Sequence, residues 1–351
     1  MDISKILSDA VAKNASDIFI VAGRALSYTV EGNIISADSG KLKPSDTYEI
    51  LSGIYSLLPN RTMDKLEQEG NDDFSFALAG ISRFRVSAYR QRNSFAAVVR
   101  VISFTLPNPR EIGIPESVLS LSEKKKGLVL ITGTAGSGKS TTLACIIDRI
   151  NSSQNKHIIT LEDPLEFLHS HKKSIVSQRE IGTDVKDYLS ALRASLRQRP
   201  NVILLGEMRD YETIDVAMTA AETGHLIFSS LHTVGAANTI ERIIDVFPPN
   251  QQQQIAFQLA MVLQAVASQQ LVPTLDGRLV PVFEIMTVTP AIRNLIRENK
   301  IHQVDNVISS AQSSEMISMD NALLELYKQG IISDKTALTY CANPEMLAKK
   351  L

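Results

Sequence analysis

The sequence predicts an α/β protein in two parts: a small N-terminal α+β domain, then a larger domain in which a parallel sheet lies between helices. Strand-like segments of alternating apolar and polar residues fill much of the first hundred positions. After about residue 117, short and wholly apolar strands alternate with helical segments. A stretch rich in Pro and Gly, residues 103–116, separates the two patterns and predicts a linker.

The N-terminal domain is predicted at residues 1–102. Apolar residues at helical spacing indicate a helix over residues 2–14, and Pro44-Ser45-Asp46 indicates the start of another that runs to about Leu58. Polar and apolar residues alternate along 83–88, so one face of the sheet is expected to be open. The predicted strands are residues 17–21, 26–30, 33–35, 74–78, 84–89 and 95–102, with a hairpin at Glu31-Gly32 between the second and third.

The second domain is predicted at residues 117–288. Its strands are apolar on both faces, which indicates a parallel sheet covered on both sides; they are residues 128–132, 158–161, 202–205 and 226–231. The uncharged stretch from Asn250 to Thr274 is interrupted by many glutamines, so we predict a buried helix there and not a membrane span. A helical region follows at 289–351, with helix starts at Thr289-Pro290 and Ser333-Asp334.

Composition excludes several classes of protein. Apolar residues make up 44% of the chain and charged residues 21%, as in ordinary globular proteins. The formal net charge is −2, which does not favour a protein that coats nucleic acid or anionic lipid. The two cysteines, Cys145 and Cys341, are too few and too far apart for a disulfide framework or a cysteine zinc site. With no signal-peptide pattern at the N-terminus, we expect a cytoplasmic protein.

The strongest motif is GTAGSGKS at 133–140, which matches G-x-x-x-x-G-K-[ST] between an apolar strand and a helix. Backbone N–H groups of such a loop surround phosphate oxygens, and the helix N-terminus adds partial positive charge. We expect Lys139 to be a solvent-facing ligand that bridges the β- and γ-phosphates, and Ser140 to hold Mg²⁺. The predicted nucleotide-binding residues are Gly133, Thr134, Ala135, Gly136, Ser137, Gly138, Lys139, Ser140 and Thr141.

Two acidic residues follow predicted strands. Glu162 ends the strand in HIITLEDPLEF, and Glu207 follows the strand in NVILLGEMRD. Because carboxyl ends of parallel strands share one edge of a sheet, both side chains can face the γ-phosphate. We assign Glu162 as the base that orients the attacking water and Glu207 to the Mg²⁺ shell. The alternative for each is a solvated acid in a loop.

Histidines stand near both ends of GHLIFSSLHT at 224–233. His232, at the carboxyl end, can sense the γ-phosphate or a neighbouring carboxylate and is a candidate catalytic residue. The alternative is a structural histidine. A metal site shared by His225 and His232 is not favoured, because seven positions along a strand place them on opposite faces and far apart.

Four blocks of sequence together resemble a known family. GTAGSGKSTT, TLEDPLEF, GEMRDYETIDVAMTAAETGHLIFSSLHT and TPAIRNLIRE are similar to the type II/type IV secretion ATPase superfamily, with its Walker A, Asp box, Walker B and His box motifs. AIRNLIRE at 291–298 resembles the signature of the pilus-retraction (twitching motility) branch. The resemblance covers nearly the whole chain. It implies a PAS-like N-terminal domain and a RecA-like P-loop NTPase domain whose helical C-terminal region carries AIRNLIRE.

The resemblance also implies an assembly and partners. It implies a cytoplasmic homohexamer that hydrolyses ATP with Mg²⁺ at subunit interfaces, bound to the pilus platform protein at the inner face of the cytoplasmic membrane. Nucleic acid and a transmembrane segment are not expected. In this family, basic residues of the N-terminal domain act as arginine fingers, and Arg85 and Arg100 stand at the matching positions. The alternative for both is a solvated basic strand face.

Three other functions compete with pilus retraction. A pilus-extension or type II secretion ATPase is disfavoured by AIRNLIRE and by the lack of a four-cysteine zinc motif. A RecA-like nucleic-acid motor needs a basic channel with stacking aromatics, whereas this chain has no Trp and 5% aromatic residues. A scaffold that binds nucleotide without hydrolysing it is disfavoured by Glu162 and Glu207.

Overall fold

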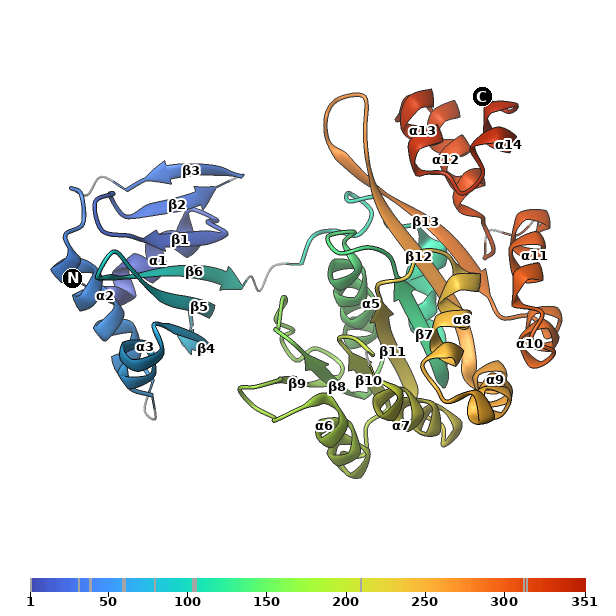
Figure 1. Ribbon diagram of the computed structural model, residues 1–351, viewed down its shortest axis with the longest axis horizontal. Helices are drawn as coiled ribbons and strands as arrows, with labels where there is room; N and C mark the ends of the chain where they lie inside the picture. Colours follow the sequence, from blue (N-terminus) through green and yellow to red (C-terminus); the bar gives the residue numbers. More distant parts are fainter. Residues whose placement is uncertain are drawn as a thin grey trace. The chain divides into compact units, whose positions relative to one another are not determined.

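The computed structural model describes residues 2–30, 32–37, 40–58, 61–78, 80–102, 106–208, 210–311, 313 and 315–351. The chain divides into two compact units, one of residues 1–105 with 166–168 and one of residues 106–165 with 169–351 (Figure 1). Each unit has its own sheet, which confirms the α/β class. The predicted domain limits at residues 102, 116 and 288 stay predictions, and residues 103–105 of the predicted linker lie outside the described residues.

The first unit is an antiparallel sheet with helices packed on one face. Its described strands follow the order β3-β2-β1-β6-β5-β4. Helices α1 and α2 bring Leu7, Ile50 and Leu51 into the core beneath the sheet. These elements are α1 (Ile3–Ala12), β1 (Asp17–Ile20), β2 (Ser27–Val30), β3 (Asn33–Ser36), α2 (Pro44–Ser56), α3 (Asp64–Glu69), β4 (Asn71–Leu78), β5 (Ser82–Gln91) and β6 (Ser94–Ile102).

The alternation predicted along residues 83–88 is confirmed. Phe84, Val86 and Ala88 of β5 are buried, while Arg83 and Arg85, which alternate with them, are half-buried. The predicted hairpin is also present, since Val30 of β2 pairs with Asn33 of β3; Glu31 itself lies outside the described residues. One face of this sheet is therefore polar and accessible, as expected from the sequence.

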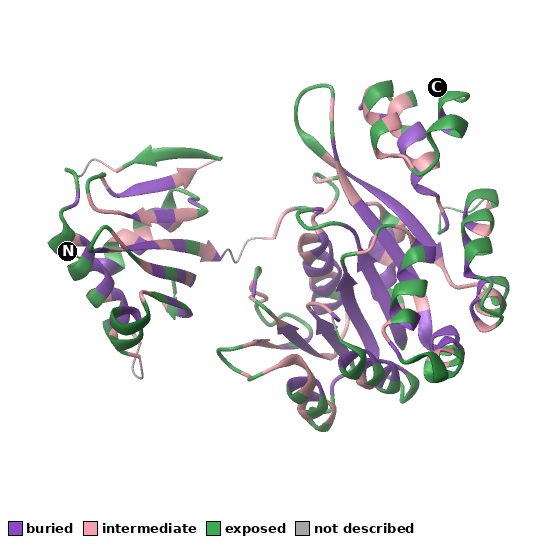
Figure 2. Cartoon of the chain, in the orientation of Figure 1, coloured by how far each residue is buried: buried purple, intermediate pink, exposed green. Residues whose placement is uncertain are grey.

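The second unit is a mixed sheet with helices on both faces. Its described strands follow the order β13-β12-β7-β11-β10-β8-β9; all neighbours are parallel except β12 and β13. β7, β10 and β11 are buried along their whole length (Figure 2). The strands are β7 (Gly127–Thr132), β8 (His157–Glu162), β9 (Ile175–Glu180), β10 (Val202–Leu205), β11 (Leu226–Leu231), β12 (Leu263–Pro273) and β13 (Leu279–Thr287).

Alternate strand residues serve two hydrophobic cores, one on each face of this sheet. Val129 and Ile131 of β7 pack with α4 and α5, whereas Leu128 and Leu130 pack with the core that includes α6 to α11. The helices are α4 (Glu116–Leu119), α5 (Lys139–Ser153), α6 (Tyr188–Ser195), α7 (Tyr211–Glu222), α8 (Ala236–Asp245), α9 (Pro249–Val262), α10 (Pro290–Arg297), α11 (Val304–Ser310), α12 (Met319–Lys328), α13 (Asp334–Tyr340) and α14 (Pro344–Ala348), with 3₁₀ turns Ser120–Glu123, Leu196–Gln198 and Ile301–Gln303.

The buried helix predicted within 250–274 is present, but it occupies only the first half of that stretch. Helix α9 ends at Val262, and Leu263 begins strand β12, which pairs with both β7 and β13. Two neighbouring strands satisfy the backbone of this segment, so it takes the strand conformation although no breaker separates it from the helix. No helix in the described part of the chain is long and apolar enough to cross a membrane.

The C-terminal region is helical, as predicted, and it rests on the long hairpin of β12 and β13. Leu323 and Leu324 of α12 and Ile332 pack with Val272 and Val282 of that hairpin. Helix α10 begins at Thr289-Pro290, where the Thr289 side chain accepts a hydrogen bond from the backbone N–H of Ile292. Ser333 caps α13 in the same way.

Candidate nucleotide-binding site

The predicted residues of the second unit meet at one edge of its sheet. β7, β11, β10 and β8 are parallel neighbours, so their carboxyl ends lie side by side (Figure 1). β7 continues into the glycine-rich loop, and His232 follows β11. Glu207 follows β10 after one glycine, and Glu162 is the last residue of β8. Ligands of open parallel sheets bind at such an edge.

The loop at 133–138 lies directly on β12. Gly133 and Gly138 have φ angles of 139° and 87°. A Cβ on Gly133 would lie 2.1 Å from the carbonyl oxygen of Gln269, and one on Gly138 would lie 2.8 Å from Nε2 of Gln269. Both positions therefore require glycine. Gly138 is the N-cap of α5 and provides no side-chain cap, so backbone N–H groups of the first turn suit an anion.

Lys139 is buried, at 8% exposure, so the expectation of a solvent-facing lysine was wrong. Its Nζ donates to the carbonyl oxygens of Gly133 and Thr134, both at 2.8 Å. The loop curls over the side chain and satisfies the ammonium group with its own carbonyls. Nζ also lies 3.5 Å from Nδ1 of His232. The lysine is thus held at the head of the loop, beside the end of β11.

His232 lies between the loop lysine and Glu207. Its Nδ1 faces Lys139, and its Nε2 is 3.6 Å from Oε2 of Glu207. The Lys139–His232 distance is at the limit of hydrogen bonding, and the His232–Glu207 distance is a close contact beyond that limit. The side chain of Glu207 is 12% exposed and that of His232 58%. Both residues line a cavity of about 490 Å³, which leaves room for solvent next to them.

Hydrogen bonds between neighbouring loops fix the strand ends. The backbone N–H of Gly206 donates to the carbonyl of Leu161 at 2.8 Å, and Ser230 Oγ donates to the carbonyl of Gly206 at 2.6 Å. A Cβ on Gly206 would lie 3.4 Å from Cα of Glu162 and 2.8 Å from the Tyr188 hydroxyl. A side chain at position 206 would have to displace the Tyr188 hydroxyl and would press on the backbone of β8. Glycine therefore lets the residue before Glu207 lie against the end of β8, which carries Glu162.

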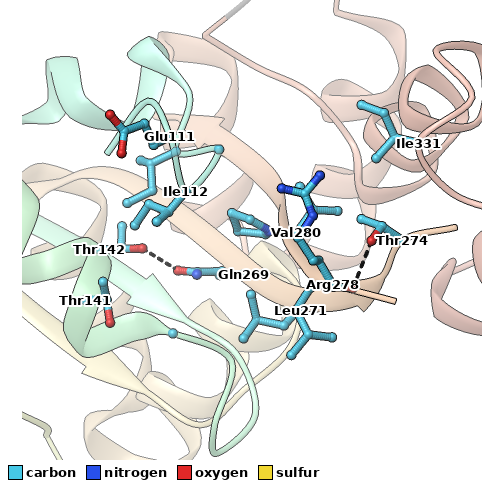
Figure 3. Close-up of a pocket in the computed structure, with 15 residues that line it drawn as sticks. Glu111, Ile112, Thr141, Thr142, Gln269, Leu271, Thr274, Arg278, Val280 and Ile331 are labelled. Carbon is cyan, nitrogen blue, oxygen red and sulfur yellow. Dashed lines mark hydrogen bonds between the residues drawn. The ribbon is translucent and has the colours of Figure 1, made fainter. Parts of the chain in front are cut away.

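A second pocket, of about 510 Å³, lies beside the first turn of α5, and the sequence reasoning did not find it (Figure 3). Gln269 and Thr142 point toward each other there, and Thr142 Oγ1 donates to Oε1 of Gln269 at 2.8 Å. At the mouth, Arg278 Nε donates to Asp276 Oδ2 at 2.8 Å. Further lining residues are Ile112, Ile114, Thr141, Leu271, Thr274 and Val280.

The side chains of the pocket come from the loop before α4, from α5, and from the hairpin of β12 and β13. Two of these three segments carried no motif, and the strands of the hairpin were not predicted. The one sequence signal was Gln269, one of several polar residues within a largely apolar stretch, and it is buried.

Arg85 and Arg100 lie in the first unit. They pair directly across β5 and β6. Arg100 Nε donates to Oδ1 of Asp17 on β1 at 3.1 Å, and its side chain is 67% exposed. Their proposed work on a γ-phosphate stays a prediction.

Magnesium fits the residues of the second unit. Within the described ranges, no three His, Cys, Asp or Glu side chains form a group that can hold a metal. Ser140 and Glu207 cannot form a closed metal site on their own. Their hydroxyl and carboxylate oxygens are ligands of the kind that Mg²⁺ takes, and phosphate oxygens and waters commonly supply the rest.

The geometry agrees with the relatives of this chain. The family described as type II/IV secretion system protein matches residues 1–329. The chain belongs to this family. The type IV pilus retractation ATPase PilT of Pseudomonas aeruginosa is 41% identical over 345 residues, which cover 98% of this chain and 99% of that protein. A twitching motility protein of Neisseria gonorrhoeae is 44% identical over 307 residues, 87% of this chain and 82% of that protein.

A solved structure of the same secretion family extends the likeness to the fold. The crystal structure of the pilus retraction motor PilT with bound ADP has a TM-score of 0.90 and 44% identity, and it covers 99% of each chain. The resemblance drawn from the four sequence blocks is therefore confirmed. So is the fold, an N-terminal α+β domain followed by a RecA-like domain.

Proposed function

We propose that this protein is an ATPase that powers type IV pilus retraction, the movement behind twitching motility. The observation that carries the proposal is the meeting of Lys139, His232 and Glu207 at one sheet edge, in a chain 41% identical to PilT along its length. PilT is named as a pilus retraction ATPase, and its solved relative holds ADP. These names support ATP as the nucleotide that is hydrolysed and the pilus as the structure that is retracted.

Two parts of the second unit would hold the nucleotide. The loop and the first turn of α5, residues 133–141, surround the phosphates, with Lys139 Nζ on the β- and γ-phosphate oxygens. The base lies in the 510 Å³ pocket against Ile112 and Leu271. Gln269, in contact with Thr142, stands between the two parts and joins them.

The acidic residues have separate roles in our proposal. Ser140 and Glu207 hold Mg²⁺, which neutralises phosphate charge when bound. Glu162 accepts a hydrogen bond from the attacking water and orients it toward the γ-phosphorus. His232 contacts both Lys139 and Glu207, so it responds to a charge that appears or leaves between them.

A neighbouring copy would complete the site. We assign Arg85 and Arg100 as arginine fingers that reach the γ-phosphate of the adjacent subunit, where guanidinium groups offset the charge of the transition state. The accessible polar sheet face that carries them supports this role. We propose a homohexamer in the cytoplasm, attached to the pilus platform protein at the inner face of the cytoplasmic membrane.

The test combines purified protein with cells. The purified chain is expected to hydrolyse ATP, and deletion of its gene is expected to give cells that carry surplus pili and do not twitch. The wild-type gene should restore retraction and a Lys139→Ala gene should not. A protein without ATPase activity would contradict the proposal. Cells that lose their pili on deletion would instead indicate an extension ATPase.

A further inference from the structure

A buried carboxylate that the proposed chemistry does not use joins the histidine loop to the C-terminal helices. Glu284 of β13 is 8% exposed. It accepts a hydrogen bond from the backbone N–H of Ala236 at 2.7 Å and another from the backbone N–H of Met319. Ala236 is the first residue of α8 and Met319 the first of α12. One side chain therefore satisfies the N-termini of two helices.

Helix α8 begins without a side-chain cap of its own. Its N-cap is Gly235, with a φ of 90°. The sheet supplies the missing acceptors: the N–H of Gly235 donates to Ser268 Oγ at 2.9 Å, and the next N–H donates to Glu284. Ser268 and Glu284 are directly opposite each other on β12 and β13, so both side chains lie on one face. This pair attaches the start of α8 to the sheet.

The start of α8 in turn determines where the histidine lies. Only Thr233 and Val234 separate His232 from Gly235. Thr239 closes the short loop, because its Oγ1 lies 2.7 Å from Thr233 Oγ1 and also donates to the carbonyl of Gly235 at 2.7 Å. Because this loop is short and closed, a displacement of Gly235 would also displace the imidazole of His232, which lies beside Lys139 and Glu207.

The charge of Glu284 matters as well as its shape. The pKa of Glu284 is raised overall, because burial and the negative charges of Asp305 and Asp320 outweigh the lowering effect of the N–H groups of Ala236 and Met319. The ionised form interacts favourably with the positive ends of both α8 and α12. An uncharged side chain of the same shape loses that attraction, and an amide presents a donor to one of the two N–H groups.

We propose that Glu284 is a positioning residue for ATP turnover, which holds His232 in register with Lys139 and Glu207 and links that histidine to α12. The inference rests on the ATPase function proposed above. Among the described residues, the hydrogen bonds of Glu284 go to α8 and α12 and not to the loop at 133–138. Its loss therefore affects turnover and leaves nucleotide binding largely intact.

The first test is Glu284→Gln in the full-length protein. We expect kcat to fall by ~10-fold or more, while KM for ATP and the affinity for ADP change by less than about threefold. Glu325→Gln is the control, because it makes the same carboxylate-to-amide change at an exposed position of α12. It should keep wild-type kcat. Unchanged kcat in Glu284→Gln would overturn the proposal.

A double-mutant cycle separates a positioning role from general damage to the fold. If Glu284 acts through His232, Glu284→Gln should add almost nothing to the loss already caused by His232→Ala. Losses that multiply in the double variant would overturn the link. Should Glu284→Gln be unstable, Ser268→Ala removes the neighbouring acceptor and should give the same selective loss of kcat. A wild-type protein with no ATPase activity would instead refute the proposed function itself.

Discussion

Arg85 and Arg100 stand directly opposite each other on β5 and β6, and Asp17 stands opposite Arg100 on β1. The three side chains therefore form a row on one face of the sheet. Two like charges placed opposite each other destabilise a sheet unless an anion lies near them. Asp17 is bonded to Arg100, at 3.1 Å. In the arginine-finger role that we propose, a phosphate of a neighbouring copy would balance the charge of Arg85.

Removal of either arginine is expected to slow hydrolysis without preventing nucleotide binding. Arg85→Ala or Arg100→Ala should lower kcat within the ~10³- to 10⁵-fold range of arginine fingers. The measurement is ATPase rate beside ADP affinity. Arg92→Ala, at an exposed position in the turn between the same two strands, is the control and should behave as wild type.

Mixing experiments test whether the arginines act on a neighbour. An Arg85→Ala subunit and a Lys139→Ala subunit, inactive alone, should regain some activity together, because some interfaces then pair an intact arginine with an intact loop. Mixtures that co-assemble and stay inactive would exclude catalysis across the interface.

Lys139→Ala is expected to abolish ATPase activity while the protein stays folded. The side chain is bonded to the loop's own carbonyls and contributes little to either hydrophobic core, so far-ultraviolet circular dichroism should be unchanged. Lys125→Ala removes an exposed lysine before β7 and should have no effect. Near wild-type turnover in Lys139→Ala would show that the loop at 133–140 is not part of the active site.

Substitutions of Glu162 and Glu207 should have different effects on nucleotide binding and turnover. Glu162→Gln should bind Mg-ATP and not turn it over, whereas Glu207→Ala should also weaken Mg²⁺-dependent binding. If both variants keep more than about a tenth of the normal rate, each contributes less than ~1.4 kcal/mol to lowering the barrier, and the assignment is wrong. Glu222→Gln, at the exposed end of α7, is the control.

The AIRNLIRE helix, α10, should separate hydrolysis from pilus retraction. Arg293 Nη1 donates to the carbonyl of Met261 at 3.2 Å and so caps the last turn of α9. Arg297 Nε is buried and has no hydrogen-bond partner among the described residues. Arg297→Ala, alone or with Arg293→Ala, should keep much of the ATPase activity and abolish retraction in cells. Normal twitching in the double variant would leave the helix a structural role only.

A matched change on the same helix should act through stability instead. Leu295 packs against the core that contains Ile292 and Ile296, both 0% exposed. Leu295→Asp buries an unpaired charge and should lower the melting temperature and the ATPase activity together. Loss of retraction with little loss of stability is therefore expected for Arg297→Ala and not for Leu295→Asp.

Protonation of Asp148 at low pH should lower the free energy of unfolding. The His169 ring and the Lys172 ammonium lower the pKa of Asp148 from 3.8 to about 2, and Lys172 Nζ lies 2.7 Å from Oδ1. The ionised Asp148 carboxylate stabilises the fold at pH values above its pKa in the unfolded chain. This stabilisation is lost as the pH falls through the lower pKa that the carboxyl has in the folded protein. In denaturant unfolding near pH 6, the free energy of unfolding of the wild type should exceed that of Asp148→Asn by about 2 kcal/mol. This difference should shrink as the pH is lowered toward 2. Exposed Asp215→Asn should show no such trend.

Local patterns predicted much of this fold, and there is a physical reason why they missed strand β12. The four predicted strands of the second unit are short apolar runs bounded by breakers or charged residues. β12 has no such boundary: Val262 ends a helix and Leu263 begins a strand, and both lie in one uncharged stretch. The pairing with β7 and β13 decides its conformation, and that information is not local.

The residues of the site also divide into those that local patterns predicted and those that they missed. The loop at 133–140 and Glu207 belong to motifs whose residues are close in sequence. Gln269 and Glu284 lie outside every motif and make their contacts over sequence separations of 127 and 48 residues. Such contacts become visible only once the strand order is known.

Strand β12 carries Ser268 and Gln269 as neighbours, and they serve opposite faces of the sheet: Ser268 holds the start of α8, and Gln269 holds α5. An irregularity between Leu263 and Ala265 sets this register against β7. Insertion or deletion of a single residue between Ala265 and Gln269 would exchange the two faces and break both contacts at once. The exposed turn at Asp276-Gly277 bears no such restriction. As the sequence evolves, changes in chain length should therefore accumulate at the tip of this hairpin and be eliminated a few residues away.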